Sequence, residues 1–207
     1  TFLMEALWTR CMPAFQRAKA WVKANRIGDV KLITANFSFL GDSSPENRLY
    51  NPLLQGGSLF DAGIYPIDFA AGILDEFPTT VSGLAHIAAT GVDEAESFSL
   101  GFASGAMASL NSGFTVNARN QAVIYGTRGR IVVEECVGPQ WCDCFDENGR
   151  QLEHFEELTP DGFVYQIQHC ADLIRAGKLE SDLIPWADSI SSARIFDELR
   201  RQWGLLQ

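Results

Sequence analysis

The sequence predicts an α+β fold, a single domain with a large, mostly antiparallel (mixed) open β-sheet covered on one face by helices. Three observations predict it. A lone strand pattern stands between two helical patterns near the start, about six strand patterns follow without a helix between them, and two helical patterns close the chain. Hairpin turns make most of the sheet antiparallel. Helices at both ends of the sequence can then cover one of its faces.

The first helix is predicted to begin at Pro13 and to end before Gly28. Proline suits the first turn because its missing N–H would have no partner there, and glycine commonly ends a helix. Phe15, Ala18 and Trp21 form its apolar stripe. A strand follows at residues 30–39, where apolar and polar residues alternate, as in a strand with one buried face.

Residues 40–55 are rich in Gly, Ser, Pro and Asn and predict a long loop. Loops of this length are uncommon unless they serve a site or a partner. The segment GGSLFDAGIYPID, residues 56–68, leads from this loop into a second helix that is predicted to continue to about Leu74.

Strands are predicted from residue 80 to about 155, with turns at Ser104 and Gly105, at residues 126–129, and at Asn148 and Gly149. Two helices are predicted to close the chain. The apolar stripe of the first is expected to comprise Phe163, Ile167, Cys170, Ala171 and Ile174, and that of the second Ile190, Ala193, Phe196, Leu199 and Trp203.

Composition narrows the function. The 207 residues carry a net charge of −10, which disfavours a nucleic-acid partner, and no apolar run is long enough to predict a membrane span. The five cysteines are odd in number and unevenly spaced, which favours reduced thiols and a cytoplasmic location. We expect no metal site, because Cys142 and Cys144 lack further ligands at a recognisable spacing.

The segment GGSLFDAGIYPID carries the candidate chemistry. Asp61, Tyr65 and Asp68 stand at positions i, i+4 and i+7, which share a helix face, and Phe60, Ile64, Ile67 and Ala71 would form the opposite, core-facing stripe. An acid and a phenol can together transfer a proton, although a nearby cation must lower the tyrosine pKa from about 10.

Pro66 complicates this geometry, because it cannot donate a helix hydrogen bond and disfavours the α region for Tyr65. The helix is expected either to kink at Pro66 or to begin properly only there. The residues alone therefore leave two interpretations open: an acid/base site, or a capped, kinked helix with solvent-facing polar side chains.

Four segments resemble a known family. EALWTRCMP (5–13), NRLYNPLLQGGSLFDAGIYPIDFA (47–70), AVIYGTRGRI (122–131) and GKLESDLIPWADSI (177–190) are similar to the Gfo/Idh/MocA family of NAD(P)-dependent oxidoreductases. Within it, the likeness is strongest to the branch of dimeric dihydrodiol dehydrogenase and NADP-dependent xylose dehydrogenase. The resemblance runs from residue 2 nearly to the end of the chain.

The resemblance implies roles for individual residues. The family pattern D-x-G-x-[H/Y]-x-x-D falls on residues 61–68. It implies that Tyr65 is the catalytic acid/base and that Asp61 supports it, whereas Asp68, Trp8 and Arg10 bind substrate. Trp8 and Arg10 would also lie near the nicotinamide ring of the cofactor. The substrate would be a sugar, a polyol or a cyclic diol.

The resemblance also implies a longer parent protein. Family members place a Rossmann domain, which binds NAD or NADP, before a substrate-binding α+β domain whose open sheet face makes a homodimer. The family's Glu-Lys-Pro motif, with its catalytic lysine, would lie upstream of residue 1, and no G-x-G-x-x-G turn follows a strand here. Residues 1–207 are thus expected to be the C-terminal domain, with the dinucleotide-binding domain absent and no cofactor tightly bound. The alternative is a stand-alone, non-catalytic module that oligomerises or binds a small polyol.

Overall fold

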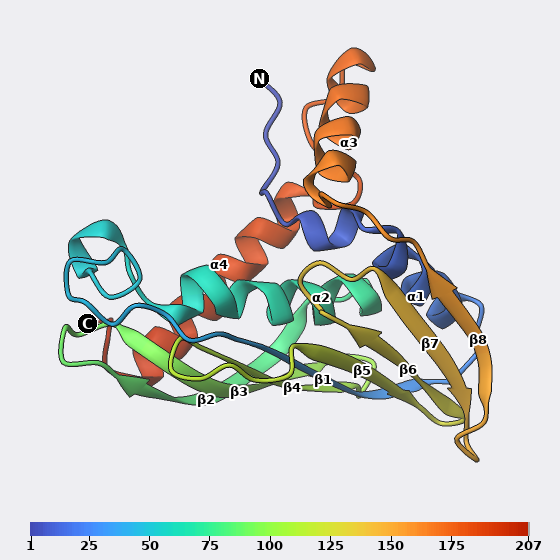
Figure 1. Cartoon of the computed structure of the whole chain (residues 1–207), viewed down its shortest axis with the longest axis horizontal. Helices are drawn as coiled ribbons and strands as arrows, with labels where there is room; N and C mark the ends of the chain where they lie inside the picture. The colour runs from blue at the N-terminus through green and yellow to red at the C-terminus, as the bar shows by residue number, and fades with distance from the viewer. Residues whose placement is uncertain (207) are drawn as a thin grey trace.

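The computed structural model describes residues 1–206 (Figure 1). The helices are α1 (Pro13–Lys23), α2 (Ile64–Leu74), α3 (Phe163–Arg175) and α4 (Trp186–Gln202). The strands are β1 (Val30–Ser38), β2 (Pro78–Ile87), β3 (Asp93–Phe102), β4 (Met107–Gly113), β5 (Gln121–Gly126), β6 (Gly129–Glu134), β7 (Trp141–Asp146) and β8 (Gln151–Glu156).

All eight strands form one sheet in the order β2-β3-β4-β1-β5-β6-β7-β8. β1 lies parallel to β4, and every other neighbouring pair is antiparallel. The parallel pair arises because the chain leaves β1, passes through the loop and α2, and returns to the sheet at β2. The predicted α+β fold with a mostly antiparallel mixed sheet is confirmed.

Helices α1, α2 and α4 lie over one face of the sheet (Figure 1). The strand residues beneath them make the core, and Ile33, Leu100, Leu110, Ile124 and Ile131 are fully buried. From α1, the predicted residues Phe15, Ala18 and Trp21 join the same core. The sheet therefore provides a rigid floor on which the helices, and the side chains that they carry, are fixed.

The free edge of β2 is blocked by side chains of the C-terminal segment. The Gln202 amide accepts a hydrogen bond from Gly83 N and donates one to Val81 O, and the Trp203 indole donates one to Gly83 O. An unpaired strand edge invites pairing with another chain. These contacts occupy backbone groups in the middle of the edge.

The predicted apolar stripe of α4 is partly wrong. Leu199 is buried as expected, but Ile190 is exposed and Ile195 is buried instead. The helix is thus rotated relative to the predicted stripe, because α4 packs against both β2 and α2. β2 and α2 contact α4 from different directions and together define its buried face. The spacing of apolar residues in the sequence indicates only one such direction.

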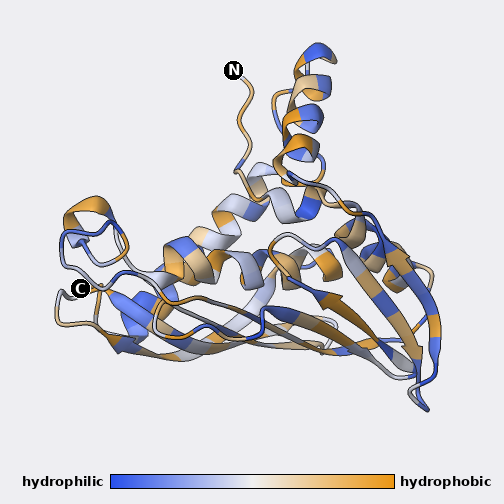
Figure 2. Cartoon of the chain, in the orientation of Figure 1, coloured by the Kyte–Doolittle hydropathy of each residue, from blue (hydrophilic) through white to orange (hydrophobic). Residues whose placement is uncertain are grey.

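α3 stands away from the sheet and has no buried residue (Figures 1 and 2). Phe163, Ile167 and Ile174, which were predicted to face the core, are 47%, 65% and 56% exposed, so that prediction is wrong. The physical reason is position: α3 extends beyond the layer formed by α1, α2 and α4. Within residues 1–206, Phe163 of this stripe packs on Trp8 and Cys170 contacts Met4, while Ile167 and Ile174 remain more than half exposed.

Two further observations concern metals and membranes. Within residues 1–206, no group of three or more His, Cys, Asp or Glu side chains is placed to hold a metal ion. The same residues contain no helix with the length and apolar character that crossing a membrane requires. The five cysteines are free thiols, and Cys136, Cys142 and Cys144 are buried in the core.

Candidate active site

The segment GGSLFDAGIYPID forms a continuous helical entry to α2. The backbone turns helical at Ser58, passes through a π-helical turn at Leu59–Gly63 and continues as α2. The helix does not begin at Pro66, because α2 starts at Ile64 and the π turn precedes it. A proline ring clashes with the carbonyl four residues earlier in an α-helix, and the π turn places the irregular backbone just before it.

The two glycines before the helix leave room for other atoms of the same chain. Gly57 has φ +126°, and a Cβ atom on it would lie 2.7 Å from a carboxylate oxygen of Asp93. A Cβ atom on Gly56 would lie 2.7 Å from Leu49 O. The Asp93 carboxylate accepts a 2.6 Å hydrogen bond from Leu59 N, which caps the helix start. The groups that approach these two glycines closely are therefore backbone atoms and the Asp93 carboxylate.

Asp61 and Tyr65 line a cavity of about 350 Å³. The π turn shifts the helix faces relative to a regular α-helix. Phe60 and Ile64, predicted on the opposite stripe, line the same cavity, and Asp68 is buried elsewhere; the predicted division of faces is wrong for these three residues. The remaining lining comes from the leading segment and α4: Glu5, Ala6, Leu7, Ser189, Ser192, Ala193 and Phe196.

Tyr65 is half-buried, and its ring meets the Phe37 ring edge-on at 5.5 Å between centroids. Burial raises the pKa of its hydroxyl, a hydrogen bond from the Trp8 side chain acts in the opposite direction, and the Asp61 and Asp68 carboxylates raise it further. None of these groups is a cation. As the described residues stand, Tyr65 remains protonated at neutral pH and is equipped to donate a proton.

Asp61 forms an ion pair with Arg48, at 2.6 Å between the guanidinium and a carboxylate oxygen. Arg48 belongs to the long loop, which thus folds back over the start of α2. The hydrogen bond to Asp61 raises the pKa of Arg48. The sequence analysis missed this pairing, although an arginine in a loop that leads directly to an acidic motif is the signal that indicates it.

Trp8 lies on a 3₁₀ turn, Trp8–Cys11, that precedes α1. Its ring packs on Phe163 at 4.7 Å between centroids, and a Cβ atom on Gly138 or Gly162 would lie 2.4 Å from the indole. These glycines leave room for the indole, which reaches Tyr65 from the side of α3. Trp8 therefore lies beside the tyrosine, but it is not among the residues that line the cavity.

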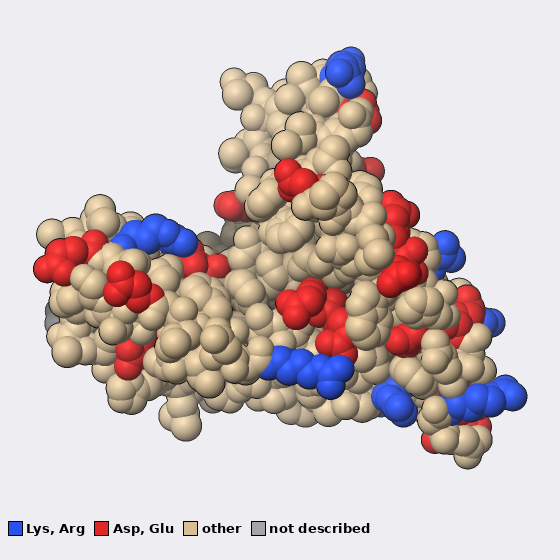
Figure 3. All heavy atoms as spheres, viewed as in Figure 1, with Lys and Arg blue, Asp and Glu red and all other residues tan. Residues whose placement is uncertain are grey.

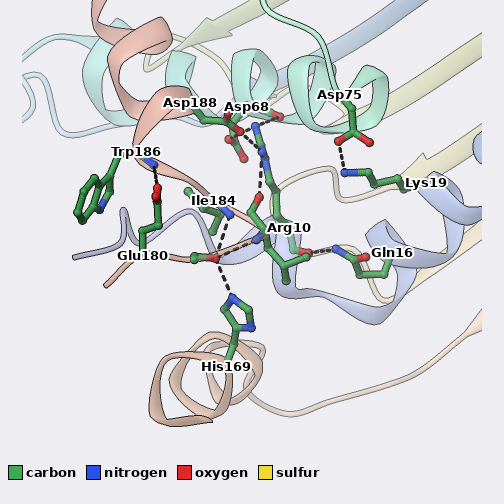
Figure 4. Close-up of polar contacts among 12 residues, drawn as sticks. Arg10, Gln16, Lys19, Asp68, Asp75, His169, Glu180, Ile184, Trp186 and Asp188 are labelled. Atoms are coloured by element: carbon green, nitrogen blue, oxygen red, sulfur yellow. Dashed lines mark hydrogen bonds and ion pairs between the residues drawn. The ribbon is translucent and has the colours of Figure 1, made fainter. Parts of the chain in front are cut away.

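Arg10 and Asp68 form a buried ion pair (Figure 4). Arg10 is 4% exposed and Asp68 is 1% exposed, with 2.7 Å between Nη2 and Oδ1. Arg10 also pairs with Asp188 at the start of α4 and donates a 3.0 Å hydrogen bond to Leu183 O. The predicted substrate ligands Arg10 and Asp68 thus engage each other, and neither lines the cavity.

Burial and charge act against each other in this pair. Burial raises the pKa of Asp68 to about 6, while Arg10 acts to lower it. Burial alone would lower the pKa of Arg10, but the carboxylates of Asp68 and Asp188 outweigh it and raise that pKa. Both groups are charged at neutral pH. The network joins the Trp8 turn, α2 and α4, which are the elements that surround the cavity.

A larger hollow of about 650 Å³ lies between β2 and the outer side of α4. Its walls include Phe77, Ile190 and Arg194, and Glu198 at its end pairs with Arg201. It contains no acid and phenol that face each other. We therefore place the candidate active site in the smaller cavity.

A family model for the GFO/IDH/MocA C-terminal domain matches residues 15–132, more than half of the chain. The chain belongs to the Gfo/Idh/MocA family. It is 29% identical over 217 residues to rabbit (Oryctolagus cuniculus) trans-1,2-dihydrobenzene-1,2-diol dehydrogenase, covering 99% of this chain and 64% of that enzyme. It is 31% identical over 211 residues to the Xenopus tropicalis enzyme of the same name, covering 99% of this chain and 63% of that enzyme.

Solved structures of this family share the fold. The aldose-aldose oxidoreductase from Caulobacter crescentus, complexed with glycerol, superposes with TM-score 0.83 and 24% identity, covering 97% of this chain and 61% of that chain. KijD10, a 3-ketoreductase from Actinomadura kijaniata in complex with NADP and TDP-benzene, superposes with TM-score 0.81 and 20% identity, covering 98% and 62%. The chain thus spans less than two thirds of the relatives that it matches.

The described residues of this Gfo/Idh/MocA chain do not fit a dinucleotide. Pyrophosphate binding uses free N–H groups at a glycine-rich helix start. Among the described residues, two glycines precede only the helical segment that leads into α2. The Leu59 N–H at its start donates a hydrogen bond to the Asp93 carboxylate, which also fills the space beside Gly57. A pyrophosphate would meet this carboxylate's negative charge. These residues therefore offer the pyrophosphate of a dinucleotide no binding site.

A buried acid supports the π turn from below. Glu96 on β3 is 5% exposed and accepts a hydrogen bond from the Ser112 hydroxyl, and a Cβ atom on Gly63 would lie 3.0 Å from its carboxylate. Burial raises the pKa of Glu96 to about 8, and Asp93 adds to the rise. The sequence analysis missed Glu96, although it shares the inward phase of Phe98 and Leu100 along β3.

Glu96→Gln is expected to change how stability depends on pH. Between pH 4.5, the usual pKa of the group, and about 8, the folded state holds a proton that the unfolded state has lost. Wild-type stability therefore falls as pH rises through this interval, by at most about 1.4 kcal/mol per pH unit from this group. Urea unfolding at pH 6, 7 and 8 measures the difference between the free energies of unfolding of the wild type and Glu96→Gln. The contributions of the other titratable groups cancel in this difference. If the free energies of unfolding of the two proteins changed equally with pH, the prediction would be wrong.

Proposed function

We propose that this chain is the substrate-binding and dimerisation domain of an NAD(P)-dependent dehydrogenase that acts on a sugar, a polyol or a cyclic diol. The observation that carries the proposal is the cavity with Tyr65 and Asp61 in its wall. Trans-1,2-dihydrobenzene-1,2-diol dehydrogenases and a 3-ketoreductase are among its relatives, and the latter was determined with NADP. These names supply the substrate and cofactor classes of the proposal.

Tyr65 transfers the hydroxyl proton of the substrate in this proposal. Its hydroxyl is protonated and can therefore donate its proton when a carbonyl is reduced. In the oxidation direction it must pass that proton to a base before it can accept the proton of the substrate hydroxyl. Variants of KijD10 with a changed lysine or a changed tyrosine were also determined with NADP and TDP-benzene. A nicotinamide, when bound by another region of the protein, supplies the hydride.

The other site residues receive more specific roles. Asp61 accepts hydrogen bonds from substrate hydroxyls, and Arg48 limits the directions from which they can approach. Trp8 lies beside Tyr65 without lining the cavity and remains a candidate for contact with the nicotinamide. Arg10 and Asp68 act as positioning residues, because their charged groups are buried and bind each other. This revises the substrate-binding role that the family resemblance implies for them.

The experiment joins a nucleotide-binding region to the chain. The region of the Xenopus tropicalis dehydrogenase that this chain does not match is fused before Thr1, and reduction of NADP⁺ or NAD⁺ is followed with dihydrodiols, aldoses and polyols. Turnover of at least one class is expected. A fused protein that folds and binds NADPH but turns over none of them would contradict the proposal.

The same experiment addresses the second candidate, a stand-alone module that binds a small polyol without catalysis. Five of the eleven residues that line the cavity are polar or acidic, including Asp61 and two serines of α4, which suits a polyol. Calorimetric titration of the chain alone with glycerol and xylitol, combined with an inactive fused protein, would favour this candidate.

We further propose that the chain forms a homodimer through the open face of the sheet. The helices cover the opposite face (Figure 1), and the central strands present small polar side chains here together with the exposed side chains of Leu32, Met107 and Tyr125. The exposed residues Ser97 and Ser99 of β3 pair in register with Asn111 and Ser109 of β4. Such a flat face allows two copies to approach closely, and a two-fold dimer is the commonest symmetric assembly.

Ser109→Arg is expected to convert this dimer to a monomer. Ser109 is exposed near the centre of the face, so arginine should leave the fold intact while placing a bulky charge between the two copies. Sedimentation velocity measures the mass, and circular dichroism checks the fold. Thr79→Arg, an exposed change near the end of β2, is the control. A Ser109→Arg protein that remains dimeric would contradict the proposed interface.

The free cysteines support a proposed cytoplasmic location. Cys136, Cys142 and Cys144 are buried among apolar core residues, where burial raises their thiol pKa and keeps them protonated. Protonated, buried thiols of this kind are compatible with a reducing compartment.

A further inference from the structure

Glu96 is a buried acid that has no counterion among residues 1–206. On the face of the molecule shown in Figure 3, Asp and Glu side chains lie at the surface, and several lie next to Lys or Arg. The buried Asp68 forms an ion pair with an arginine. Glu96 is 5% exposed and interacts with the hydroxyls of Ser58 and Ser112 and with the Asp93 carboxylate, none of which is a cation. The proposed proton transfer does not use this group.

Glu96 contacts the π turn, Leu59–Gly63, near both of its ends. Its carboxyl interacts with the hydroxyl of Ser58, where the helical backbone begins. At the other end of the turn, a Cβ atom on Gly63 would lie 3.0 Å from Glu96 Oε1 and 3.0 Å from Ser112 Oγ. The backbone of the turn therefore rests directly on the Glu96 and Ser112 side chains, which hydrogen-bond each other.

The two buried carboxyls beneath this turn differ in their partners. Burial raises the pKa of Asp93, whereas hydrogen bonds from the backbone N–H groups of Leu59 and Ser58 act to lower it. The charge of Arg200 on α4 acts in the same direction as these bonds. For Glu96, burial and the Asp93 charge outweigh two serine hydroxyls and raise the pKa to about 8. At neutral pH the pair therefore holds one negative charge, on Asp93, and Glu96 carries a proton.

Other charged groups on the elements around Glu96 have partners of their own. Asp61, on the π turn, lines the cavity and pairs with a loop arginine. On the neighbouring strand β2, His86 is exposed and pairs with Glu94. β4, Met107–Gly113, contains no charged residue. The ionisation of Glu96 is therefore governed by its burial and by Asp93.

We propose that Glu96 is a positioning residue, whose protonated carboxyl holds the π turn in place and thereby sets Asp61 and Tyr65 in the cavity wall. The part of this inference that concerns catalysis rests on the proposed function. Loss of the proton would leave a second carboxylate beside Asp93, buried and without a cation, which is costly. β3 and β4 are paired along their length, so the turn is the neighbour that is free to move away. We therefore expect the turn to loosen, and catalysis to fall, as pH rises through about 8.

Hydrogen exchange of the chain alone tests the proposal without a cofactor. Protection of the amides of residues 59–65 is measured at pH 7 and pH 9, corrected for the intrinsic pH dependence of exchange, with the amides of α1 as internal reference. In the wild type, a pKa of about 8 leaves roughly one molecule in ten protonated at pH 9, so protection is expected to fall by up to about tenfold. Glu96→Gln keeps a neutral side chain of the same size and should retain the protection. Glu156→Gln, the same change at an exposed position of β8, is the control and should behave like the wild type.

Ser112→Ala is a second variant, which leaves Glu96 itself unchanged and keeps the proposal testable if Glu96→Gln fails to fold. The Ser112 hydroxyl acts to lower the pKa of Glu96. Its removal should therefore move the loss of protection in residues 59–65 to higher pH. A loss at the same pH as in the wild type would overturn the proposal.

The fused protein described above tests the effect on catalysis. The ratio of kcat/KM of Glu96→Gln to that of the wild type is expected to rise by up to about tenfold between pH 7 and pH 9. A ratio that did not change with pH would confine Glu96 to a structural role and overturn its role in positioning.

The exchange results also separate this inference from the proposed function. Equal pH dependence of protection in the wild type and Glu96→Gln would overturn the inference, whether or not the fused protein turns over substrate. A fused protein that binds NADPH without turnover would contradict the proposed function. The exchange of residues 59–65 in the chain alone would then still decide whether the proton on Glu96 holds the turn.

Discussion

Arg10→Ala is expected to lower the free energy of unfolding by roughly 3–5 kcal/mol, the typical cost of removing one partner of a buried ion pair. The guanidinium is 4% exposed and neutralises Asp68, which is 1% exposed, together with Asp188. Removing it leaves Asp68 charged in a site without a counterion, or forces it to take up a proton. It also disconnects α2 from the start of α4.

Urea unfolding followed by tryptophan fluorescence measures this loss. Arg48→Ala is the matched control, because Arg48 also pairs with an aspartate but is 66% exposed; its loss should be no more than about 1 kcal/mol. Asp68→Asn combined with Arg10→Ala should cost less than the sum of the two single changes, because neither charge is then left alone. Equal losses for Arg10→Ala and Arg48→Ala would show that the buried network does not hold the domain together.

Tyr65→Phe is expected to reduce kcat of the fused enzyme by about 10²–10⁴-fold, with a smaller change in KM. Phenylalanine keeps the ring that packs on Phe37 at 5.5 Å and removes only the hydroxyl. The fold and the cavity should survive, so the loss reports on proton transfer. The same variant of the chain alone should unfold within about 1 kcal/mol of the wild type, since a single hydrogen bond is at stake.

Steady-state kinetics with the best substrate of the panel measures the effect. Tyr125→Phe, which removes a hydroxyl from a tyrosine on the open sheet face, is the control and should retain the wild-type kcat. An unchanged kcat in Tyr65→Phe would eliminate Tyr65 as the group that transfers the hydroxyl proton of the substrate. A large rise in KM alone would assign the hydroxyl to substrate binding instead.

Much of the fold could be predicted from local patterns. The alternation in β1, the turn residues at Gly105 and Gly149, and the proline that begins α1 report on short-range backbone preferences, which act within a few residues. They are therefore readable without knowledge of the rest of the chain. The order of the strands, with β1 between β4 and β5, is set by distant pairings that no local pattern records.

The sequence by itself determined where the candidate chemistry lies: Asp61 and Tyr65 in one short segment do line one cavity. Only the tertiary structure decided what surrounds them. The π turn before Pro66 moved Phe60 and Ile64 into the cavity wall, and burial turned Arg10 and Asp68 toward each other. The same holds for α3, whose apolar period is plain in the sequence while its exposure is not. The physical reason is that periodicity records which side chains avoid water, whereas the identity of the layer that shields them depends on contacts between distant parts of the chain.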